Sequence, residues 1–238
     1  MKRLLQLFSI LIVGLISNEA LGQMVIDNSQ TPVQLVEDVL LGQGVVVSGI
    51  TYTGDAQQIG YFDASNANFP ITEGIVMASG DVNAIPATGA TFASTIVGVP
   101  GDADLDVVSA AGTNDAVVLE FDFVPTGDSI QFEYVFGSEE YVEFVDEGYN
   151  DVFGFFISGP GISGLRNIAL VPNTNIPVSV NSINDLRKTN YFVNNGSGTL
   201  ITQGSPIQYD GYTIPLTAKA RVNPCDLYHI KLVIADVG

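Results

Sequence analysis

From residue 44 onward the chain is built of short runs rich in β-branched and aromatic residues, and Gly, Pro, Asn and Asp interrupt these runs. The runs that we expect to form strands cover residues 45–52, 74–79, 116–124, 129–136, 152–158, 167–171 and 228–235. Many short strands separated by turn residues are typical of a sandwich or a barrel. The pattern predicts a mainly β fold, an antiparallel β-sandwich of the jelly-roll kind.

One short N-terminal helix is expected before these strands. Thr31 is a capping residue, Pro32 suits the first helical turn, and Gln34 stands three positions after the cap. Gly42 can end the helix, and the apolar residues between the two ends recur at helical spacing, at Val33, Val36, Val39 and Leu40.

The third and fourth runs both alternate between apolar and polar residues, and a four-residue stretch with turn chemistry separates them. We expect a β-hairpin in which Phe121 faces Phe132, because this register makes one face wholly apolar. The other face then sets Glu120 against Glu133, a pair of like charges that destabilises a sheet unless water, a cation or a proton relieves it. We interpret that face as a solvated outer surface, with a binding site as the alternative.

The first 22 residues have the features of an export signal. Two basic residues precede an apolar run at 4–16, and Ala20 and Gly22 supply small residues at the −3 and −1 positions of a cleavage site. The run is about 13 residues long, shorter than the roughly 20 that a membrane-spanning helix needs. We therefore expect a secretory signal peptide over residues 1–22, no direct membrane insertion, and a protein that is secreted or held at the cell surface.

Charge and composition exclude several functions. The chain has 26 Asp and Glu against 8 Lys and Arg, a formal charge of −18, and its basic residues are scattered, so we expect no nucleic-acid partner and no anionic lipid partner. Hydrophobic residues make up 46% of the chain, which argues against disorder. Cys225 is the only cysteine, so neither an intrachain disulfide nor a zinc cluster can form, and we expect it to be a small buried residue.

Residues 137–151 form a long acidic connection between two expected strands, with no basic residue in it. Its hydrophobic residues argue against disorder, so folding must bring several carboxylates together. Calcium takes six to eight oxygen ligands and would relieve their repulsion. We expect a calcium site with ligands from Glu139, Glu140, Glu143 and Asp151. The aromatic residues that we expect the loop to present to a partner are Tyr141, Phe144 and Tyr149.

A second acidic cluster alternates carboxylates along the chain. Asp102 and Asp104 would contribute to the same calcium site if their loop lies at the same end of the sandwich. The alternative is that these residues cap a turn or a short helix.

Two segments resemble a known family. The sequences Val-Phe-Gly-Ser-Glu-Glu-Tyr at 135–141 and Asn-Asp-Val-Phe-Gly-Phe-Phe-Ile-Ser-Gly-Pro-Gly at 150–161 closely resemble the signature of the choice-of-anchor L domain. The likeness extends over nearly all of residues 23–238, including 34–42, 101–105, 167–172 and 228–236. The resemblance implies a single β-rich extracellular module of secreted and surface proteins of bacteria, especially those that use type IX secretion, and it implies no enzymatic activity.

Two departures from the family pattern matter. Relatives often carry a cysteine about where this chain has Asp146, which implies that Cys225 lacks its partner. Family domains also continue past residue 236 with another Asp-containing turn and a final apolar strand. The resemblance therefore implies a domain that is truncated at its C-terminus and that belongs to a longer protein with an anchor or sorting region. If the final strand belongs beside strand 228–235 or nearby, an unpaired edge and some core are exposed, and we then expect aggregation or low stability.

Three functions compete. We expect a non-catalytic extracellular binding or adhesion module that calcium stabilises and whose partner is an extracellular protein or a glycan. The second interpretation is a purely structural spacer domain, and the third is a glycoside hydrolase that uses two carboxylates. His229 is the only histidine and alternates with apolar residues in an expected strand, so we expect it on a strand surface rather than in a catalytic triad. A ligand-sized pocket beside the acidic loop would favour binding over the spacer.

Overall fold

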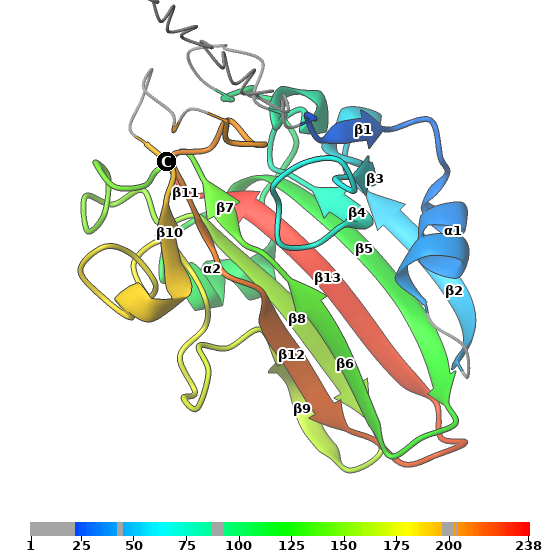
Figure 1. The fold of residues 1–238 in the computed structure, drawn as a ribbon. Coiled ribbons are helices and arrows are strands. Elements are labelled where there is room, and N and C mark those ends of the chain that lie inside the picture. The colour runs from blue at the N-terminus through cyan, green and yellow to red at the C-terminus, as the bar shows by residue number, and fades with distance from the viewer. Residues whose placement is uncertain (1–21, 42–44, 87–92, 197–201, 203) are drawn as a thin grey trace, which may run out of the picture.

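The computed structural model describes residues 22–41, 45–86, 93–196, 202 and 204–238. Its sheets are antiparallel and packed in layers as in a sandwich, and its helices are few and short, so the predicted mainly β fold is confirmed. The back layer in Figure 1 is a five-stranded sheet in the order β2-β5-β13-β8-β9. Its strands are β2 (Val45–Thr53), β5 (Asn114–Pro125), β8 (Val152–Gly159), β9 (Ile162–Asn167) and β13 (Tyr228–Asp236).

The second layer is made of separate smaller sheets. A two-stranded sheet pairs β6 (Ser129–Tyr134) with β12 (Leu216–Arg221), and a three-stranded sheet has the order β1-β3-β4. The strands of this three-stranded sheet are β1 (Val25–Asp27), β3 (Ile59–Asp63) and β4 (Glu73–Met77). At one end a third small sheet joins β7 (Gly137–Ser138), β10 (Phe192–Asn194) and β11 (Gly211–Thr213).

The strand at 228–236 is the middle strand of the large sheet. β13 pairs with β5 on one side and with β8 on the other. The expectation that this strand forms an unpaired edge is therefore wrong. Its alternate apolar residues pack on the inner face of the sheet, while Val233 on the outer face lies under a helix in a second buried cluster.

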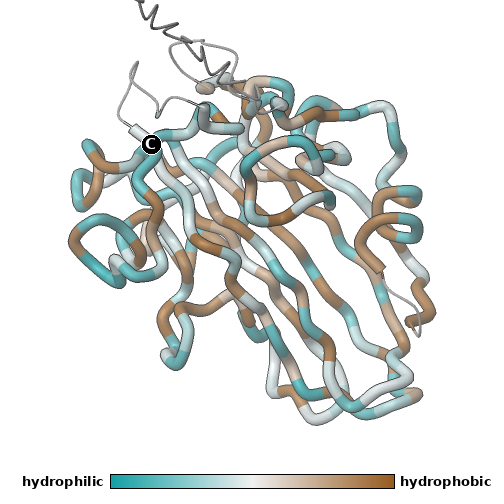
Figure 2. The backbone as a smooth tube through the Cα atoms, in the orientation of Figure 1, coloured by the Kyte–Doolittle hydropathy of each residue, from teal (hydrophilic) through white to brown (hydrophobic). Residues whose placement is uncertain are grey.

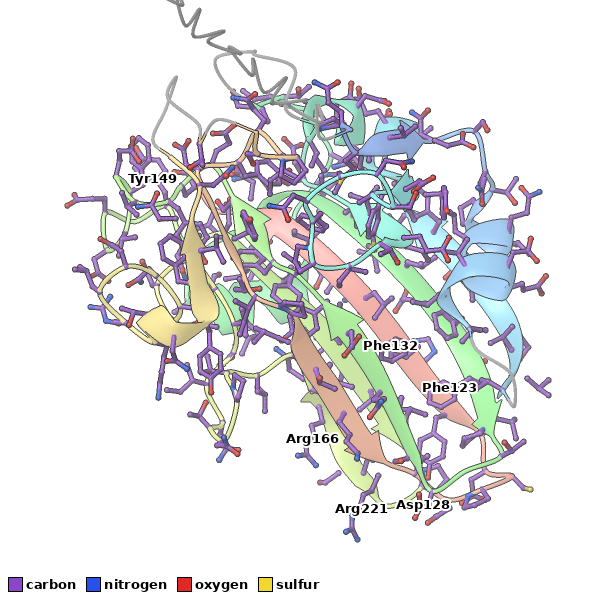
Figure 3. The ribbon with its side chains drawn as sticks, in the orientation of Figure 1. Phe123, Asp128, Phe132, Tyr149, Arg166 and Arg221 are labelled. Atoms are coloured by element: carbon purple, nitrogen blue, oxygen red, sulfur yellow. The ribbon has the colours of Figure 1, made fainter. Side chains whose placement is uncertain are left out.

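The expected hairpin does not form, because β5 and β6 belong to different layers. Phe121 pairs with Ile230 of β13, and Phe132 pairs with Ala218 of β12. The apolar residues of both strands do face the core, as Figure 3 shows for Phe123 of β5 and Phe132 of β6. Alternation fixes which face of a strand is buried but not which strand lies beside it.

The two glutamates of the expected hairpin are consequently not opposed. Glu120 lies opposite Lys231 of β13, and Glu133 lies opposite Thr217 of β12. The like-charge repulsion that the hairpin would have produced is absent from these two ladders.

The N-terminal helix forms as predicted. Thr31 caps α1 (Pro32–Gln34) by accepting a hydrogen bond from the Gln34 amide, and the Gln34 side chain accepts one from the Thr31 amide. The helix continues as a π-helical segment, Leu35–Leu40, that buries Leu35 and Val36. Gly42, expected to end it, lies outside the described residues. A second helix, α2 (Ala103–Ser109), follows Asp102, and the remaining short helical turns are Ala56–Gln58, Val82–Ala84 and Thr189–Tyr191.

The main core lies between the two layers. It gathers buried side chains from both, including Phe121, Phe153, Ile230, Leu216 and Ala218. Figure 2 shows hydrophobic positions running along the strands of both layers and hydrophilic positions in the peripheral loops. Burial of this apolar surface is the principal term that favours folding.

Cys225 is exposed rather than buried, which corrects the sequence expectation. It lies in the turn between β12 and β13 with a positive φ of 66°, and its amide donates to the Pro125 carbonyl. Asp146, where the family resemblance implies a cysteine in relatives, instead lies in the acidic loop and forms an ion pair with Arg187 at 2.8 Å.

The export signal stays a prediction, because residues 1–21 lie outside the described part of the chain. Within the described part, no helix is long and apolar enough to cross a membrane.

Candidate metal and ligand site

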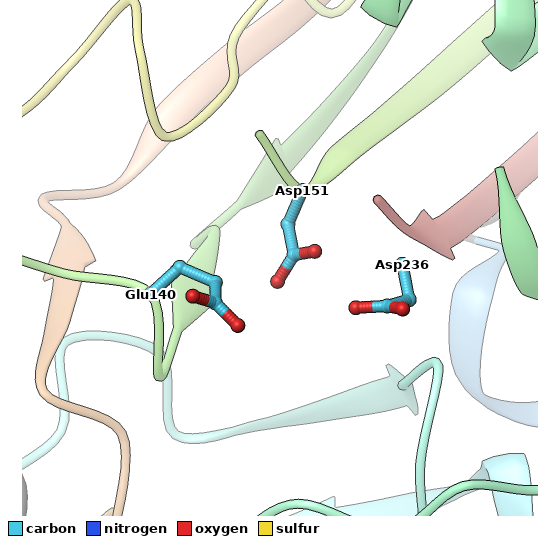
Figure 4. A group of neighbouring side chains, drawn as sticks. All are labelled: Glu140, Asp151 and Asp236. Carbon is cyan, nitrogen blue, oxygen red and sulfur yellow. The ribbon is translucent and has the colours of Figure 1, made fainter. Parts of the chain in front are cut away.

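Three carboxylates meet at one end of the sandwich. Glu140 follows β7, Asp151 directly precedes β8, and Asp236 is the last residue of β13. Each offers one oxygen, and these oxygens all lie within 4.8 Å of one another (Figure 4). Because Ala235 of β13 pairs with Val152 of β8, the adjacent residues Asp236 and Asp151 are brought together by the register of the central sheet. We call this set the acidic triad.

The backbone around β7 orients the triad. The Ser138 hydroxyl donates to Asp151 Oδ2 at 2.8 Å and accepts from the Glu140 amide at 2.9 Å. The Val237 amide donates to Asp151 Oδ1 at 3.2 Å. These bonds hold Asp151 at the start of β8 and connect it through Ser138 to Glu140 in the acidic loop.

The triad is electrostatically strained. Burial, and then the charge of Asp236, raises the pKa of Glu140 to about 7. Burial, and then the same neighbouring charge, raises the pKa of Asp151, and burial also raises the pKa of Asp236. None of the ion pairs formed by the described residues reaches the triad. Near neutral pH the site therefore keeps protons or takes up a cation, and the arrangement could hold a metal ion.

The sequence predicted two members of the triad and missed the third. Glu140 and Asp151 were expected ligands, and both flank strand ends in the acidic loop. Asp236 was not expected, although an aspartate that ends a strongly apolar strand is a visible signal. It was missed because its neighbours in space depend on which strand lies beside β13.

The two other loop acids that were expected as ligands lie outside the triad. Glu139 Oε1 accepts a hydrogen bond from the Ala93 amide, its Oε2 is buried, and burial raises the pKa of this carboxyl to about 7. Glu139 therefore stands beside the triad as a further half-buried acid. Glu143 is exposed.

Asp102 and Asp104 do not join the triad. Both accept hydrogen bonds from Lys231 Nζ, at 2.6 Å and 2.7 Å. Asp102 also caps α2 by accepting from the amides of Asp104 and Leu105. The alternative interpretation, that this cluster caps a short helix, is the correct one, because the buried lysine already supplies the positive charge that a cation would have supplied.

The aromatic residues of the loop divide into two groups. Tyr141 is fully buried and packs against Phe136 and Phe192, with ring centroids 6.4 and 4.8 Å away, so the expectation that it faces a partner is wrong. Phe144 and Tyr149 are each 43% exposed and contact each other at 5.2 Å. Their role in ligand binding stays a prediction.

A cavity of about 580 Å³ opens beside the triad, between the two layers. Its floor comes from the inner face of the large sheet, with Phe153, Phe155, Leu232 and Ile234, and β4 and β6 form its walls. Of the described residues that line it, none is Lys, Arg or His. The lining acids are Glu73, Asp115, Glu133, Glu139, Glu140, Asp151 and Asp236. The cavity thus combines an apolar floor with a negative rim.

Comparison with known proteins yields one family. The family model of the choice-of-anchor L domain matches residues 24–238. Neither a curated protein nor a solved structure matches the chain.

Proposed function

The chain belongs to the choice-of-anchor L domain family, whose presence implies a surface-anchored or secreted bacterial protein, and from this premise we propose that it is an extracellular, non-catalytic binding module with a calcium ion in the acidic triad. The observation that carries the proposal is the position of the triad on the rim of a ligand-sized cavity. The cavity favours binding over the structural spacer.

Calcium fits the chemistry of the triad. Its donors are carboxylate oxygens, which hard cations prefer, and water can complete a shell of six to eight ligands at 2.3–2.6 Å. Magnesium requires a smaller and more regular octahedron, and zinc prefers nitrogen and sulfur ligands. Oxygens that already lie within 4.8 Å of one another need little movement to share one ion. Extracellular calcium modules bind with a Kd of about 10⁻⁴ to 10⁻³ M, which suits a surface protein.

The ion would act by joining three parts of the fold. Glu140 belongs to the acidic loop, Asp151 to the start of β8, and Asp236 to the end of the central strand. Neutralising the triad removes the repulsion that opposes this arrangement, so it fixes the loop and with it the exposed pair Phe144 and Tyr149. The partner that such a surface and cavity would bind is an extracellular protein or a glycan.

The convergence of three carboxylates supports a non-catalytic role for this site. Glycoside hydrolases use a pair of carboxyl groups that flank the bond to be cleaved. In the acidic triad one oxygen from each of three carboxylates lies within 4.8 Å of the others, so all three can ligate a single ion.

Calorimetric titration of the metal-stripped protein with calcium tests the proposal. We expect saturable heat at millimolar calcium that Asp236→Asn abolishes. Glu147→Gln is the matched control, because Glu147 is an exposed acid of the same loop outside the triad. Absence of heat in the wild type, or equal heats for the wild type and Asp236→Asn, would contradict a calcium site at the triad.

A further inference from the structure

Two free strand edges border the cavity. β4 is the outer strand of the sheet β1-β3-β4, and β6 is the outer strand of the pair β12-β6. Among the described strands neither has a partner on its second side. Residues 73–77 of β4 and 131–134 of β6 line the cavity, together with the residues that follow each strand, up to 80 and up to 140. The second layer is thus interrupted where the cavity opens.

The ladder register shows which backbone groups of β6 point to the open side. The Val222 amide donates to the Asp128 carbonyl, so residues at even positions of β6 bond to β12. In an antiparallel pair the alternate residues direct their N–H and C=O groups away from the partner strand. The N–H and C=O groups of Gln131 and Glu133 therefore point away from β12, and both residues line the cavity.

The same reasoning applies to β4. The Ala78 amide donates to the Gln58 carbonyl, so Ile75 and Met77 direct their backbone groups away from β3. Both residues also line the cavity. Unpaired backbone groups therefore face the cavity from both walls.

The open edge of β6 lacks the protection that natural edges carry. Lysine, proline and bulges usually prevent another chain from pairing with an exposed edge. The other strand of this sheet, β12, carries Lys219 and Arg221, and the residues directly opposite them on β6 are Gln131 and Ser129. Glu133 of β6 lies opposite Thr217. The free edge of β12, the guarded edge, thus carries basic side chains that hinder pairing with another strand. The free edge of β6, which borders the cavity, carries none.

We propose that the cavity receives an extended peptide segment of a partner protein, which adds as a strand to the free edge of β6. Five consecutive residues, 131–135, line the cavity and span about 16 Å of extended chain. The proposal assigns a ligand class to the binding module proposed above and rests on that function.

The cavity also defines the side chains of the peptide. Residues on one face of the added strand would lie over the apolar floor formed by Phe155 and Leu232, so they should be apolar. Residues on the other face would meet Glu133 on the wall, and none of the described residues that line the cavity is basic, so they should be lysine or arginine. A cationic amphiphile would match the floor and the charge, but it would leave the backbone groups of both edges unpaired.

Peptide titration tests the proposal. The probe is a synthetic heptapeptide of alternating valine and lysine, compared with one of alternating valine and glutamate and with the lysine peptide N-methylated on the amides of one edge. We expect the lysine peptide to bind and to protect the Gln131 and Glu133 amides from hydrogen exchange, but not the Thr217 and Lys219 amides. Because it loses the backbone hydrogen bonds of one edge, the N-methylated peptide should bind at least about tenfold more weakly than the lysine peptide.

Proline variants provide matched controls. Glu133→Pro removes an amide from the open edge, and Thr217→Pro removes the amide at the directly opposite ladder position on the guarded edge. We expect only Glu133→Pro to weaken peptide binding. If Glu133→Pro does not fold, the exchange protection of the wild-type amides decides the matter.

Two outcomes would overturn the strand proposal. In the first, the lysine peptide does not bind, with calcium or with chelator present. In the second, the N-methylated peptide or dodecylamine binds as well as the lysine peptide while the Gln131 and Glu133 amides stay unprotected, and the cavity then takes a cationic amphiphile. Failure of the calcium site is seen separately, as absent heat in the calcium titration, so the two proposals are tested independently.

Discussion

The ammonium group of Lys231 and the carboxylate of Asp102 form a 2.6 Å ion pair whose side chains are only 10% and 13% exposed. Lys231 lies on the outer face of the central strand, and Asp102 caps α2. The pair therefore attaches α2 to the large sheet, where Leu105 of the helix is buried. Asp104 adds a second bond to the same ammonium, but its side chain is 41% exposed.

Lys231→Met should destabilise the fold by about 3 kcal/mol, because it leaves the enclosed Asp102 carboxylate without its counter-charge. Asp104→Asn should cost less than about 1 kcal/mol, because solvent screens this more exposed partner. Urea unfolding measures both effects, provided that the m-values of the variants equal that of the wild type. A Lys231→Met variant as stable as the wild type would show that the pair does not hold α2 in place.

Calcium should raise the melting temperature of the wild-type protein. At a tenfold excess over Kd, binding to the folded state alone adds about 1.4 kcal/mol of stability. Glu140→Gln and Asp236→Asn should remove this gain, whereas Asp102→Asn should lower the starting stability and keep the gain. Thermal unfolding with calcium, magnesium and chelator measures the effect. An equal calcium response in Asp236→Asn and the wild type would exclude the triad as the site.

The metal-free protein should become less stable as the pH rises from about 4.5 to about 7. The folded-state pKa of Glu140 is raised from 4.5 to about 7, so the folded chain holds more protons than the unfolded chain within that window. A rise in pH within this window therefore favours unfolding. The stability that the raised pKa of Glu140 contributes is fully present below about pH 4.5 and is lost by about pH 7. Asp151 and Asp236 act in the same direction.

Urea midpoints measured across this pH range in chelator test the prediction, and saturating calcium should flatten the dependence. Glu140→Gln is the control, because it removes one of the groups with a raised pKa. Stability that rises with pH over the same range would contradict protonated carboxyls in the folded state.

Tyr141→Phe should leave stability unchanged or raise it by up to about 1 kcal/mol. The Tyr141 hydroxyl is buried, and within the described structure it has no hydrogen-bond partner, so removing it relieves a desolvation cost. Tyr141→Ala should cost about 3 to 5 kcal/mol, because it empties a fully buried site beside Phe192. Chemical unfolding measures both variants. A strongly destabilised Tyr141→Phe would reveal a hydrogen bond to bound water or metal.

The features that the sequence predicted correctly depend on neighbouring residues. Thr31 and Gln34 form a capping box three positions apart, so the helix start could be read locally. Alternation along β5 and β6 likewise indicated which faces are buried. Neither pattern identifies the neighbouring strand, and both β5 and β6 pair with strands near the C-terminus. The predicted hairpin was therefore wrong, although the buried face of each of the two strands was predicted correctly.

Because local sequence does not show which strands are neighbours, only part of the candidate site could be predicted. Glu140 and Asp151 flank one connection, so composition was enough to bring them together. Asp236 reaches them only through the pairing of β13 with β8. The partner of Asp102 lies 129 positions away, and without it an aspartate that pairs with a buried lysine looks like a metal ligand.

Among the described strands β13 comes last in sequence, and it is the middle strand of the large sheet, with β2, β5, β8 and β9 all preceding it. Until β13 has been synthesised, β5 and β8 have no shared partner, and the sheet cannot close. Pairing between residues so distant in sequence is also slow. Asp236, at the end of β13, completes the acidic triad only when the sheet closes, so maturation of the fold and of the candidate ion site coincide.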